Sequence, residues 1–184
     1  MDITEQSSAL SIASLGGGCF WCLEAVYESV HGVNEVVSGY MGGAMANPSY
    51  AEVCTGTSGH AEVVQLHYDP AVIGYSDLLD IFFTLHDPTT RDRQGNDCGS
   101  QYRSVIFYHD AEQEATAKQV IAHLQPVLSA KIVTEVVPAL PFYRAEPEHQ
   151  HYFARHPEQG YCVHVVKPKV TKIKQYFPQW QRNG

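Results

Sequence analysis

The 184-residue sequence lacks several features that would place it in particular classes of protein. It has no apolar run near the ~20 residues that a membrane-spanning helix needs, and its first ten residues lack the basic and apolar segments of a signal peptide. Lysine and arginine number 12 against 20 acidic residues, and a net charge of −8 disfavours general binding to nucleic acid or anionic membranes. These absences predict a soluble cytoplasmic protein that binds neither nucleic acid nor membrane.

The composition is that of a folded chain, because apolar residues make up 44% and charged residues 17%. No internal repeat or change in composition marks a boundary, so residues 1–184 are interpreted as a single domain with a basic tail from about 167 to 184. Residue patterns predict strands at 8–15, 33–40, 61–68, 103–108, 132–137 and 161–166. They predict helices from residue 19 to Gly32, at 50–54, from an N-cap serine at 76 to 85, at 110–128 and around 148–155, and a short helix in the tail.

These strands and helices alternate, but several of the connections are short. Such an order favours a mixed or antiparallel sheet with packed helices over a doubly wound parallel sheet. We therefore expect an α+β fold: a two-layer sandwich with a mixed, largely antiparallel sheet, packed helices, a ferredoxin-like core and long coil segments.

The five cysteines are an odd number, so they do not form a simple disulfide framework. Cys19 is distinguished by its position, because it follows a strand and a Gly16–Gly18 turn and stands at the start of a helix. A helix N-terminus stabilises an adjacent anion by up to ~2 kcal/mol. That would lower a thiol pKa from about 8.5 to about 7. The sequence thus predicts a reactive thiolate at Cys19, and the alternative is a buried cysteine at a tight turn.

Cys19 and Cys22 form a CxxC pair, which is compatible with other functions. One alternative is a general dithiol oxidoreductase that acts on protein disulfides. The other is a zinc-binding module, although the second cysteine pair that a structural zinc site requires is missing. Both alternatives remain open at this point.

Several acids and hydroxyls lie near the predicted strand ends and loops. Glu62 begins a strand, Asp97 lies in a glycine-containing loop, and Tyr50 and Tyr102 follow polar loop segments. A buried carboxyl has a raised pKa and can donate a proton at neutral pH. Each of these residues also fits an ordinary role in a strand, a turn or packing.

Short motifs that occur in order along nearly the whole chain identify a relationship. They are Gly18-Cys19-Phe20-Trp21, Ser38-Gly39-Tyr40 with Gly42-Gly43, Asn47-Pro48-Ser49-Tyr50, Glu52-Val53-Cys54-Thr55-Gly56, Gly59-His60-Ala61-Glu62, Arg93-Gln94-Gly95-Asn96-Asp97, Gln101-Tyr102-Arg103-Ser104, Phe142-Tyr143, Ala145-Glu146, His149-Gln150 and Gly160-Tyr161-Cys162. Together they resemble the methionine sulfoxide reductase A family.

The resemblance implies that the chain is a catalytic domain that reduces methionine sulfoxide, with a preference for the S epimer at sulfur. By similarity Cys19 is the nucleophile that attacks the sulfoxide sulfur and becomes a sulfenic acid. Glu62 matches the acid of the family, and Tyr50 and Tyr102 match the hydroxyls around the sulfoxide oxygen. Asp97 matches a further polar residue of the site.

The same resemblance assigns Phe20 and Trp21 to an apolar wall that receives the S-methyl group of the substrate. An apolar wall beside a polar cluster orients a chiral sulfur, which gives a physical basis for choosing one epimer.

The sulfenic acid must be resolved by a second thiol. The family often uses a C-terminal cysteine, which makes Cys162 the first choice. Cys22 stands where a glycine is frequent, and it could resolve Cys19 directly or act as a relay. Cys54 and Cys98 are expected to play no chemical part.

The resemblance also implies the partners of the enzyme. Its substrates are methionine sulfoxide in oxidised proteins and free methionine sulfoxide, and thioredoxin is the expected reductant. We expect a monomer that requires no cofactor and no metal.

Overall fold

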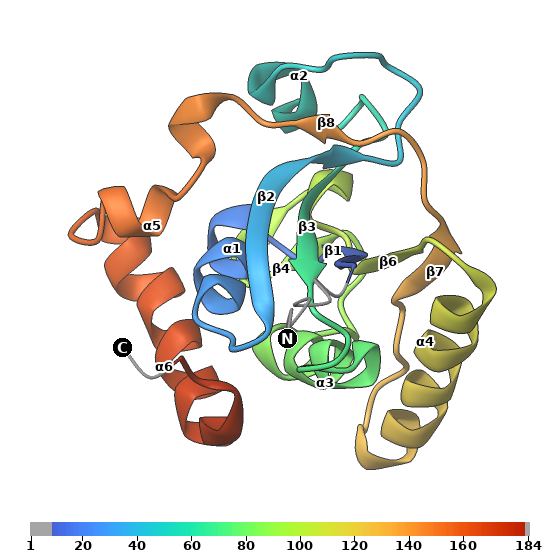
Figure 1. The fold of residues 1–184 in the computed structure, drawn as a ribbon. Coiled ribbons are helices and arrows are strands. Elements are labelled where there is room, and N and C mark those ends of the chain that lie inside the picture. The colour runs from blue at the N-terminus through green and yellow to red at the C-terminus, as the bar shows by residue number, and fades with distance from the viewer. Residues whose placement is uncertain (1–8, 183–184) are drawn as a thin grey trace, which may run out of the picture.

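The computed structural model describes residues 9–182, which form one six-stranded sheet, a two-stranded hairpin and the helices around them (Figure 1). The strands are β1 (Ser11–Gly16), β2 (Val33–Met41), β3 (Ala61–Tyr68), β6 (Val105–Tyr108), β7 (Glu135–Pro138) and β8 (Tyr143–Arg144), with β4 (Arg93–Gln94) and β5 (Asp97–Cys98) in the hairpin. The α-helices are α1 (Phe20–Glu28), α2 (Tyr50–Cys54), α3 (Tyr75–Leu85), α4 (Ala111–Leu124), α5 (Tyr152–Arg155) and α6 (Lys167–Tyr176). Shorter helical turns are η1 (Ser100–Tyr102), η2 (Gln125–Val127), η3 (Pro147–His149), η4 (Cys162–Val166) and η5 (Pro178–Trp180).

The strand order of the large sheet is β7-β6-β1-β3-β2-β8. Only β6 and β7 pair in parallel, and every other pair in this sheet is antiparallel. The strands β6, β1, β3 and β2 have the order of a ferredoxin-like core, in which α1 connects β1 to β2 and α3 connects β3 to β6. The prediction of an α+β fold with a mixed, largely antiparallel sheet is therefore confirmed.

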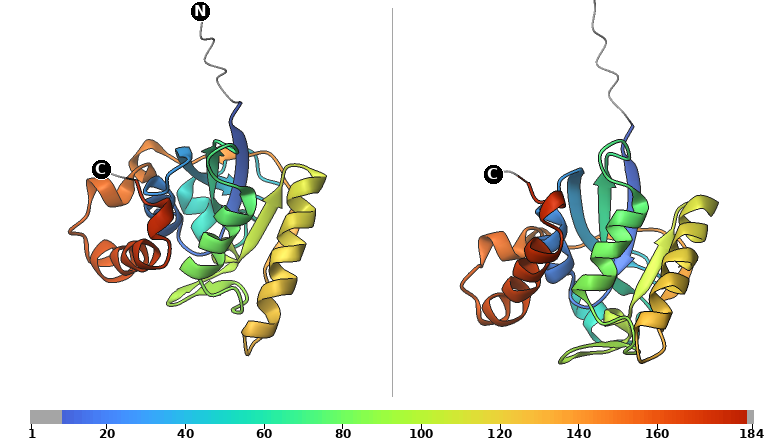
Figure 2. Two further views of the ribbon diagram at one scale, coloured as in Figure 1. Left: turned by 60° about the horizontal axis from the view of Figure 1, so that its bottom comes forward. Right: turned by 90° about the horizontal axis from the view of Figure 1, so that it is seen from below.

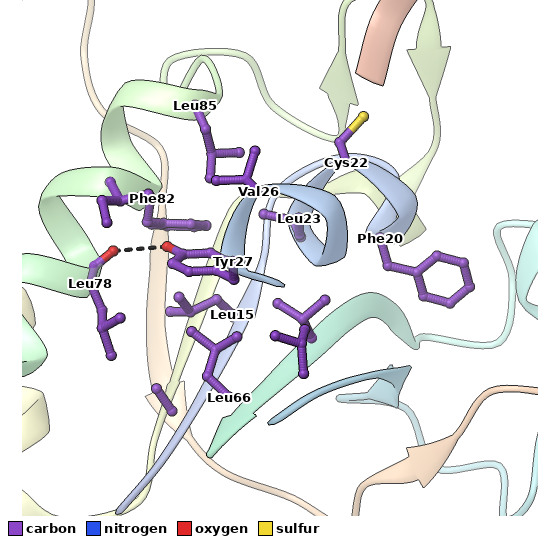
Figure 3. Packing of buried hydrophobic residues seen from close by; sticks show 14 of the residues in the cluster. Leu15, Phe20, Cys22, Leu23, Val26, Tyr27, Leu66, Leu78, Phe82 and Leu85 are labelled. Atoms are coloured by element: carbon purple, nitrogen blue, oxygen red, sulfur yellow. Dashed lines mark hydrogen bonds between the residues drawn. The ribbon is translucent and has the colours of Figure 1, made fainter. Parts of the chain in front are cut away.

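The side chains of β3 alternate between the two faces of the sheet, as those of a strand must. Val64 and Leu66 face α1 and α3, where they join the main hydrophobic cluster (Figure 3). Ala61 and Val63 face the other side and pack in a smaller cluster that the segment after β7 covers. Glu62 faces the helices like Val64 and Leu66, so the register of β3 carries its carboxyl to the N-terminal end of α1.

Helices α1 and α3 pack against each other through their apolar faces. The buried Tyr27 hydroxyl donates a hydrogen bond of 2.8 Å to the Leu78 carbonyl, which fixes one helix against the other (Figure 3). Figures 1 and 2 place α4 and the α5–α6 segment on opposite sides of the molecule, with α3 between them. No helix of residues 9–182 is long and apolar enough to cross a membrane.

The strand predicted at 161–166 is wrong. These residues form the π-helical turn η4, which continues directly into α6. The valines suggested a strand, but Cys162 and Val166 are the buried positions, and their spacing of four is helical. Pro168 cannot donate a backbone hydrogen bond to the preceding turn, and the wider π turn lies just before it.

The predicted serine cap of α3 is also wrong. The helix begins at Tyr75 with Gly74 in the N-cap position, and Ser76 lies inside the first turn. The Asp77 carboxylate accepts a hydrogen bond of 3.0 Å from the Gly74 N–H, so an acid three residues after the cap replaces the expected serine.

Candidate active site

Cys19 occupies the N-cap position of α1, directly after the glycine turn that follows β1. Gly18 has a φ of +90°, and a Cβ there would lie 3.0 Å from the side chain of Gln94, so the turn requires glycine. The Gly18 N–H donates to the Tyr102 carbonyl at 3.2 Å. This bond holds η1 against the loop that presents Cys19.

The Cys19 thiol is buried, with 8% of the residue exposed, and this changes its acidity. Burial raises the pKa of Cys19 well above its ordinary value, and the charges of Glu62 and Cys22 raise it further. Hydrogen bonds from the Trp21 backbone and the Tyr161 hydroxyl act in the opposite direction but are smaller. The sequence-based expectation of a lowered Cys19 pKa is therefore wrong, because desolvation outweighs the effect of the helix N-terminus.

The Glu62 carboxyl is buried, and its environment changes its acidity. Its side chain is 1% exposed, and Oε1 accepts a hydrogen bond of 3.2 Å from the Phe20 N–H. Its other oxygen, Oε2, is buried and has no hydrogen-bond partner among the residues that the structure describes. Burial raises the pKa of Glu62 to about 8, so the carboxyl is largely protonated at neutral pH.

Two tyrosine hydroxyls share this environment. Tyr50 is the first residue of α2 and Tyr102 is the last residue of η1. Burial raises the pKa of both, and the charge of Glu62 raises each further. They therefore remain neutral and can donate hydrogen bonds to an oxygen placed beside Glu62.

Aromatic rings line the other side of the site. The buried Phe20 ring stacks against Tyr50 with ring centroids 6.3 Å apart. Trp21 stacks on Tyr152 at 3.7 Å with the ring planes 3° apart, and its indole N–H donates to Nδ1 of His149 at 3.3 Å. The site is thus an apolar wall that faces a polar group of one carboxyl and two hydroxyls.

Asp97 contacts Tyr161, and its charge also raises the pKa of Glu62. The Tyr161 hydroxyl donates a hydrogen bond of 2.6 Å to Asp97 Oδ2 and lies 4.0 Å from the Cys22 sulfur. Sequence reasoning did not single out Tyr161 or His149, although both occur in the motifs that carried the family resemblance. The available signal was the position of each residue inside one of these motifs, since Tyr161 directly precedes Cys162 and His149 stands in the His149-Gln150 motif.

The five cysteines divide by environment. Cys19, Cys22 and Cys162 are buried, whereas Cys54 and Cys98 are exposed. The pKa of Cys22 is raised by burial first, lowered by nearby Lys169 and raised slightly by Cys162. In Figure 3 the sulfur of Cys22 points away from the packed side chains of the core. Cys22 thus lies one helical turn after Cys19, and its pKa responds to the Cys162 thiol.

Cys54 lies closer to the site than the sequence suggested. It is one helical turn after Tyr50 in α2, so the two side chains lie on the same face of the helix. A hydrogen bond with the Tyr50 hydroxyl lowers the pKa of Cys54, although burial is the larger influence and raises it. Cys98 lies in the β4–β5 hairpin beside Asp97.

Within residues 9–182, two groups of three side chains have the spacing of metal ligands. They are Glu24 with Glu28 and His151, and Glu146 with Glu148 and His149. Neither group includes Cys19 or Cys22, so the described residues give no support to a zinc site built on the CxxC pair.

Comparison with known proteins identifies one family. The model of the family described as Peptide methionine sulfoxide reductase matches residues 11–181. The chain is 55% identical to the peptide methionine sulfoxide reductase MsrA of Ralstonia nicotianae over 178 residues, which cover 94% of this chain and 93% of that protein. It is 52% identical to an MsrA of Thermus thermophilus over 90% of this chain and 94% of that protein.

Solved structures agree with this result. The methionine sulfoxide reductase A of Corynebacterium diphtheriae matches with a TM-score of 0.80 and 35% identity, over 87% of this chain and 80% of that chain. Mxr1 of Saccharomyces cerevisiae in its reduced form matches with a TM-score of 0.79 and 34% identity, over 85% and 91%. Mxr1 in complex with Trx2 matches with a TM-score of 0.56 and 27% identity, over 82% and 89%.

Proposed function

Because this chain belongs to the peptide methionine sulfoxide reductase family, we propose that it reduces the S epimer of methionine sulfoxide, free or in proteins, to methionine. The observation that carries the mechanism is the placement of Cys19 beside a protonated Glu62 whose Oε2 is buried without a partner among the described residues. A buried polar atom without a partner is costly in a native protein. A substrate oxygen that accepts the Glu62 proton would remove this cost.

The first step transfers the sulfoxide oxygen to sulfur of the enzyme. Glu62 donates its proton to the sulfoxide oxygen while Tyr50 and Tyr102 donate hydrogen bonds to it. Cys19 attacks the substrate sulfur, and its own proton passes to the Glu62 carboxylate. The protonated oxygen then passes to the Cys19 sulfur as the substrate S–O bond and the transient S–S bond break, which releases methionine. One thiol and one sulfoxide thus yield one sulfenic acid and one methionine, and Glu62 ends the step protonated. This relay accommodates the raised pKa of Cys19, because the thiol is deprotonated only when substrate is bound.

The aromatic wall sets the orientation of the substrate. Phe20 and Trp21 receive the S-methyl group, while the oxygen faces Glu62 and the two tyrosines. Only one arrangement of methyl group, oxygen and side chain around a chiral sulfur satisfies both surfaces and exposes the sulfur to Cys19.

The second step forms a disulfide. A thiolate attacks the Cys19 sulfenic sulfur, the S–O bond breaks, and the oxygen leaves as water after protonation. We propose Cys162 as the resolving thiol and Cys22 as the alternative. The position of Cys22 one helical turn from Cys19, with its N–H bonded to the Cys19 carbonyl at 3.1 Å, supports the alternative. As a relay, Cys22 would receive the disulfide after Cys162 has resolved Cys19, and the effect of Cys162 on the pKa of Cys22 supports this pairing.

The final disulfide is reduced by an external dithiol. We propose thioredoxin in the cytoplasm, with support from the complex of the relative Mxr1 with Trx2. Asp97 and Tyr161 serve both thiols of the CxxC pair, because the Tyr161 hydroxyl donates to Asp97, lies 4.0 Å from the Cys22 sulfur and lowers the pKa of Cys19 through a hydrogen bond. The steps above use only side chains of one chain and the reducing partner.

Peptide mapping of the oxidised enzyme tests this scheme. The reduced protein is mixed with one equivalent of methionine S-sulfoxide without reductant, quenched with acid and an alkylating agent, and digested. We expect a Cys19–Cys162 or Cys19–Cys22 disulfide at early times. In Cys162→Ser, the Cys19 sulfenic acid should be trapped by dimedone if Cys162 is the first resolver, whereas a Cys19–Cys22 bond would assign that role to Cys22.

A further inference from the structure

The large sheet ends at β8, and one edge of this strand carries unpaired backbone groups. Arg144 lies opposite Gly39 of β2, and the Ala145 N–H donates to the Ser38 carbonyl at 2.9 Å. In an antiparallel pair, consecutive residues turn their backbone groups alternately toward and away from the partner strand. This register therefore turns the N–H and C=O of Arg144 away from β2.

No residue between 9 and 182 forms a hydrogen bond with these two groups of Arg144. Arg144 lines an open groove of about 930 Å³. One wall of the groove is the 47–49 segment that leads into α2, and the other is the 142–147 segment that contains β8 (Figure 1). An exposed edge with unpaired backbone groups is a template for an added strand.

Glu146 links the groove to the candidate active site through hydrogen bonds. This residue lines the groove, and both of its carboxylate oxygens accept hydrogen bonds from tyrosines that pack on Phe20. Oε2 accepts a hydrogen bond of 3.0 Å from the Tyr50 N–H, and Oε1 accepts one of 3.0 Å from the Tyr40 hydroxyl. The rings of Tyr40 and Tyr50 both pack on Phe20. A side chain that lines the groove is therefore hydrogen-bonded to two aromatic residues that pack on Phe20.

We propose that the groove binds the peptide around an oxidised methionine, which adds to β8 as an extended strand paired with the Arg144 backbone. This inference rests on the proposed function and names the substrate form that the site prefers. A peptide in a nascent or damaged, locally unfolded segment offers the N–H and C=O groups that Arg144 lacks. A free amino acid would leave the groove and the Arg144 backbone unoccupied.

An N-methyl scan of a peptide substrate tests the proposal on the unaltered enzyme. The probe is a capped seven-residue alanine peptide with methionine S-sulfoxide at its centre, and each backbone N–H in turn is replaced by N-methyl. We expect kcat/KM to fall by about two- to tenfold at positions that face β8, and to change little at the alternating positions. We also expect the unmethylated peptide to exceed free methionine S-sulfoxide in kcat/KM by about tenfold.

A second measurement alters the enzyme. Arg144→Pro removes the N–H of the edge and should lower the ratio of peptide to free-substrate kcat/KM, whereas Arg144→Ala keeps the N–H and should keep that ratio. The peptide scan does not depend on the folding of either variant.

A scan without period-two alternation would overturn the proposal, as would equal kcat/KM for peptide and free substrate. A dimer in sedimentation that Arg144→Pro dissociates would also overturn it, because the edge would then pair two copies of the chain. Failure to reduce either substrate would instead reject the proposed function.

Discussion

Two glutamates, Glu24 of α1 and Glu62 of β3, are buried beside this helix, and they differ in how their oxygens are satisfied. Both are 1% exposed. Glu24 Oε2 accepts from the Ser38 hydroxyl at 3.0 Å, and Oε1 accepts from the Tyr152 N–H at 3.1 Å. Glu62 accepts from the Phe20 N–H through Oε1 alone, and its Oε2 has no partner in the part of the chain that the structure describes.

This difference distinguishes Glu24, which has a structural role, from Glu62, which is available for proton transfer. Burial raises the pKa of both residues, and that of Glu62 reaches about 8. The Glu24 carboxyl joins α1 to β2 and to the start of α5, so its hydrogen bonds hold three segments together. The Glu62 carboxyl has one oxygen without a partner among the described residues, and its charge acts on the Tyr50 and Tyr102 hydroxyls. A buried carboxyl is therefore a better sign of chemistry when one of its oxygens is unpartnered.

The largest expected effect separates the two acids by rate. Glu62→Gln removes the proton donor and should lower kcat for methionine S-sulfoxide by about 10²- to 10⁴-fold at pH 7. Glu24→Gln, the matched control, removes the buried acid of α1 and should stay within about tenfold of the unaltered enzyme. Steady-state assays with an excess of reductant measure both. Equal kcat values for Glu62→Gln and Glu24→Gln would contradict the assignment of Glu62 as the proton donor.

The next effect concerns the stability of the Glu62 region as pH changes. The pKa of Glu62 is about 8 in the folded protein and about 4.3 in an unfolded chain, so only the folded state keeps this proton between those values. The protonated Glu62 carboxyl therefore stabilises the folded state fully below about pH 4.3. This stabilisation is lost as the pH rises through 8. Glu62→Gln cannot lose a proton. Its Tm relative to the unaltered protein should rise by roughly 5 °C or more between pH 5 and pH 8 in thermal unfolding.

A flat Tm difference across this range would show that Glu62 is ionised in the folded state. Measurements at the same two pH values on Tyr176→Phe, an exposed substitution, control for effects of buffer and ionic strength.

The Glu24 region should respond in stability rather than in rate. Glu24→Gln replaces one accepting oxygen by an amide group and leaves a buried donor without its partner. We expect the free energy of unfolding to fall by about 1–3 kcal/mol. Urea denaturation measures this loss, and Glu158→Gln, an exposed site, should change it by less than about 0.5 kcal/mol. Equal losses for the two variants would contradict the structural role of Glu24.

The smallest expected effect lies in the hydroxyls beside Glu62. Tyr50→Phe removes one hydrogen bond to the sulfoxide oxygen and should lower kcat/KM by about three- to tenfold. Tyr102→Phe should have a similar effect. A larger loss in the double variant than in either single variant is expected if both hydroxyls bind the same oxygen. The exposed Tyr176→Phe serves as the control.

The sequence predicted much of the fold because local patterns determine it. The apolar spacing in α1 and the alternation in β3 indicated both elements, and the serine and glutamate at residues 49 and 52 form the capping box that starts α2. The turn η4 was misread because valines favour strands, whereas burial of Cys162 and Val166 against the core decided for a helix.

The candidate site was only partly accessible to sequence reasoning. The resemblance gathered Cys19, Glu62, Tyr50 and Tyr102, and the structure brings these residues together. The acidity of Cys19 could not be predicted from its place at a helix start, since it depends on how completely neighbouring segments exclude water. The contact between Tyr161 and Asp97 joins residues 64 positions apart and follows only from the tertiary fold.

A single-turnover assay of Cys19→Ser beside the unaltered enzyme tests whether Cys19 is the nucleophile that reduces methionine S-sulfoxide. Each reduced protein is mixed with excess methionine S-sulfoxide without reductant, and methionine is counted after rapid quenching. We expect at least about one methionine per molecule of unaltered enzyme, and the exact yield depends on how many thiols can be oxidised in turn. We expect none from Cys19→Ser. Methionine formed by Cys19→Ser, at any yield above the uncatalysed background, would contradict the role of Cys19 as the nucleophile.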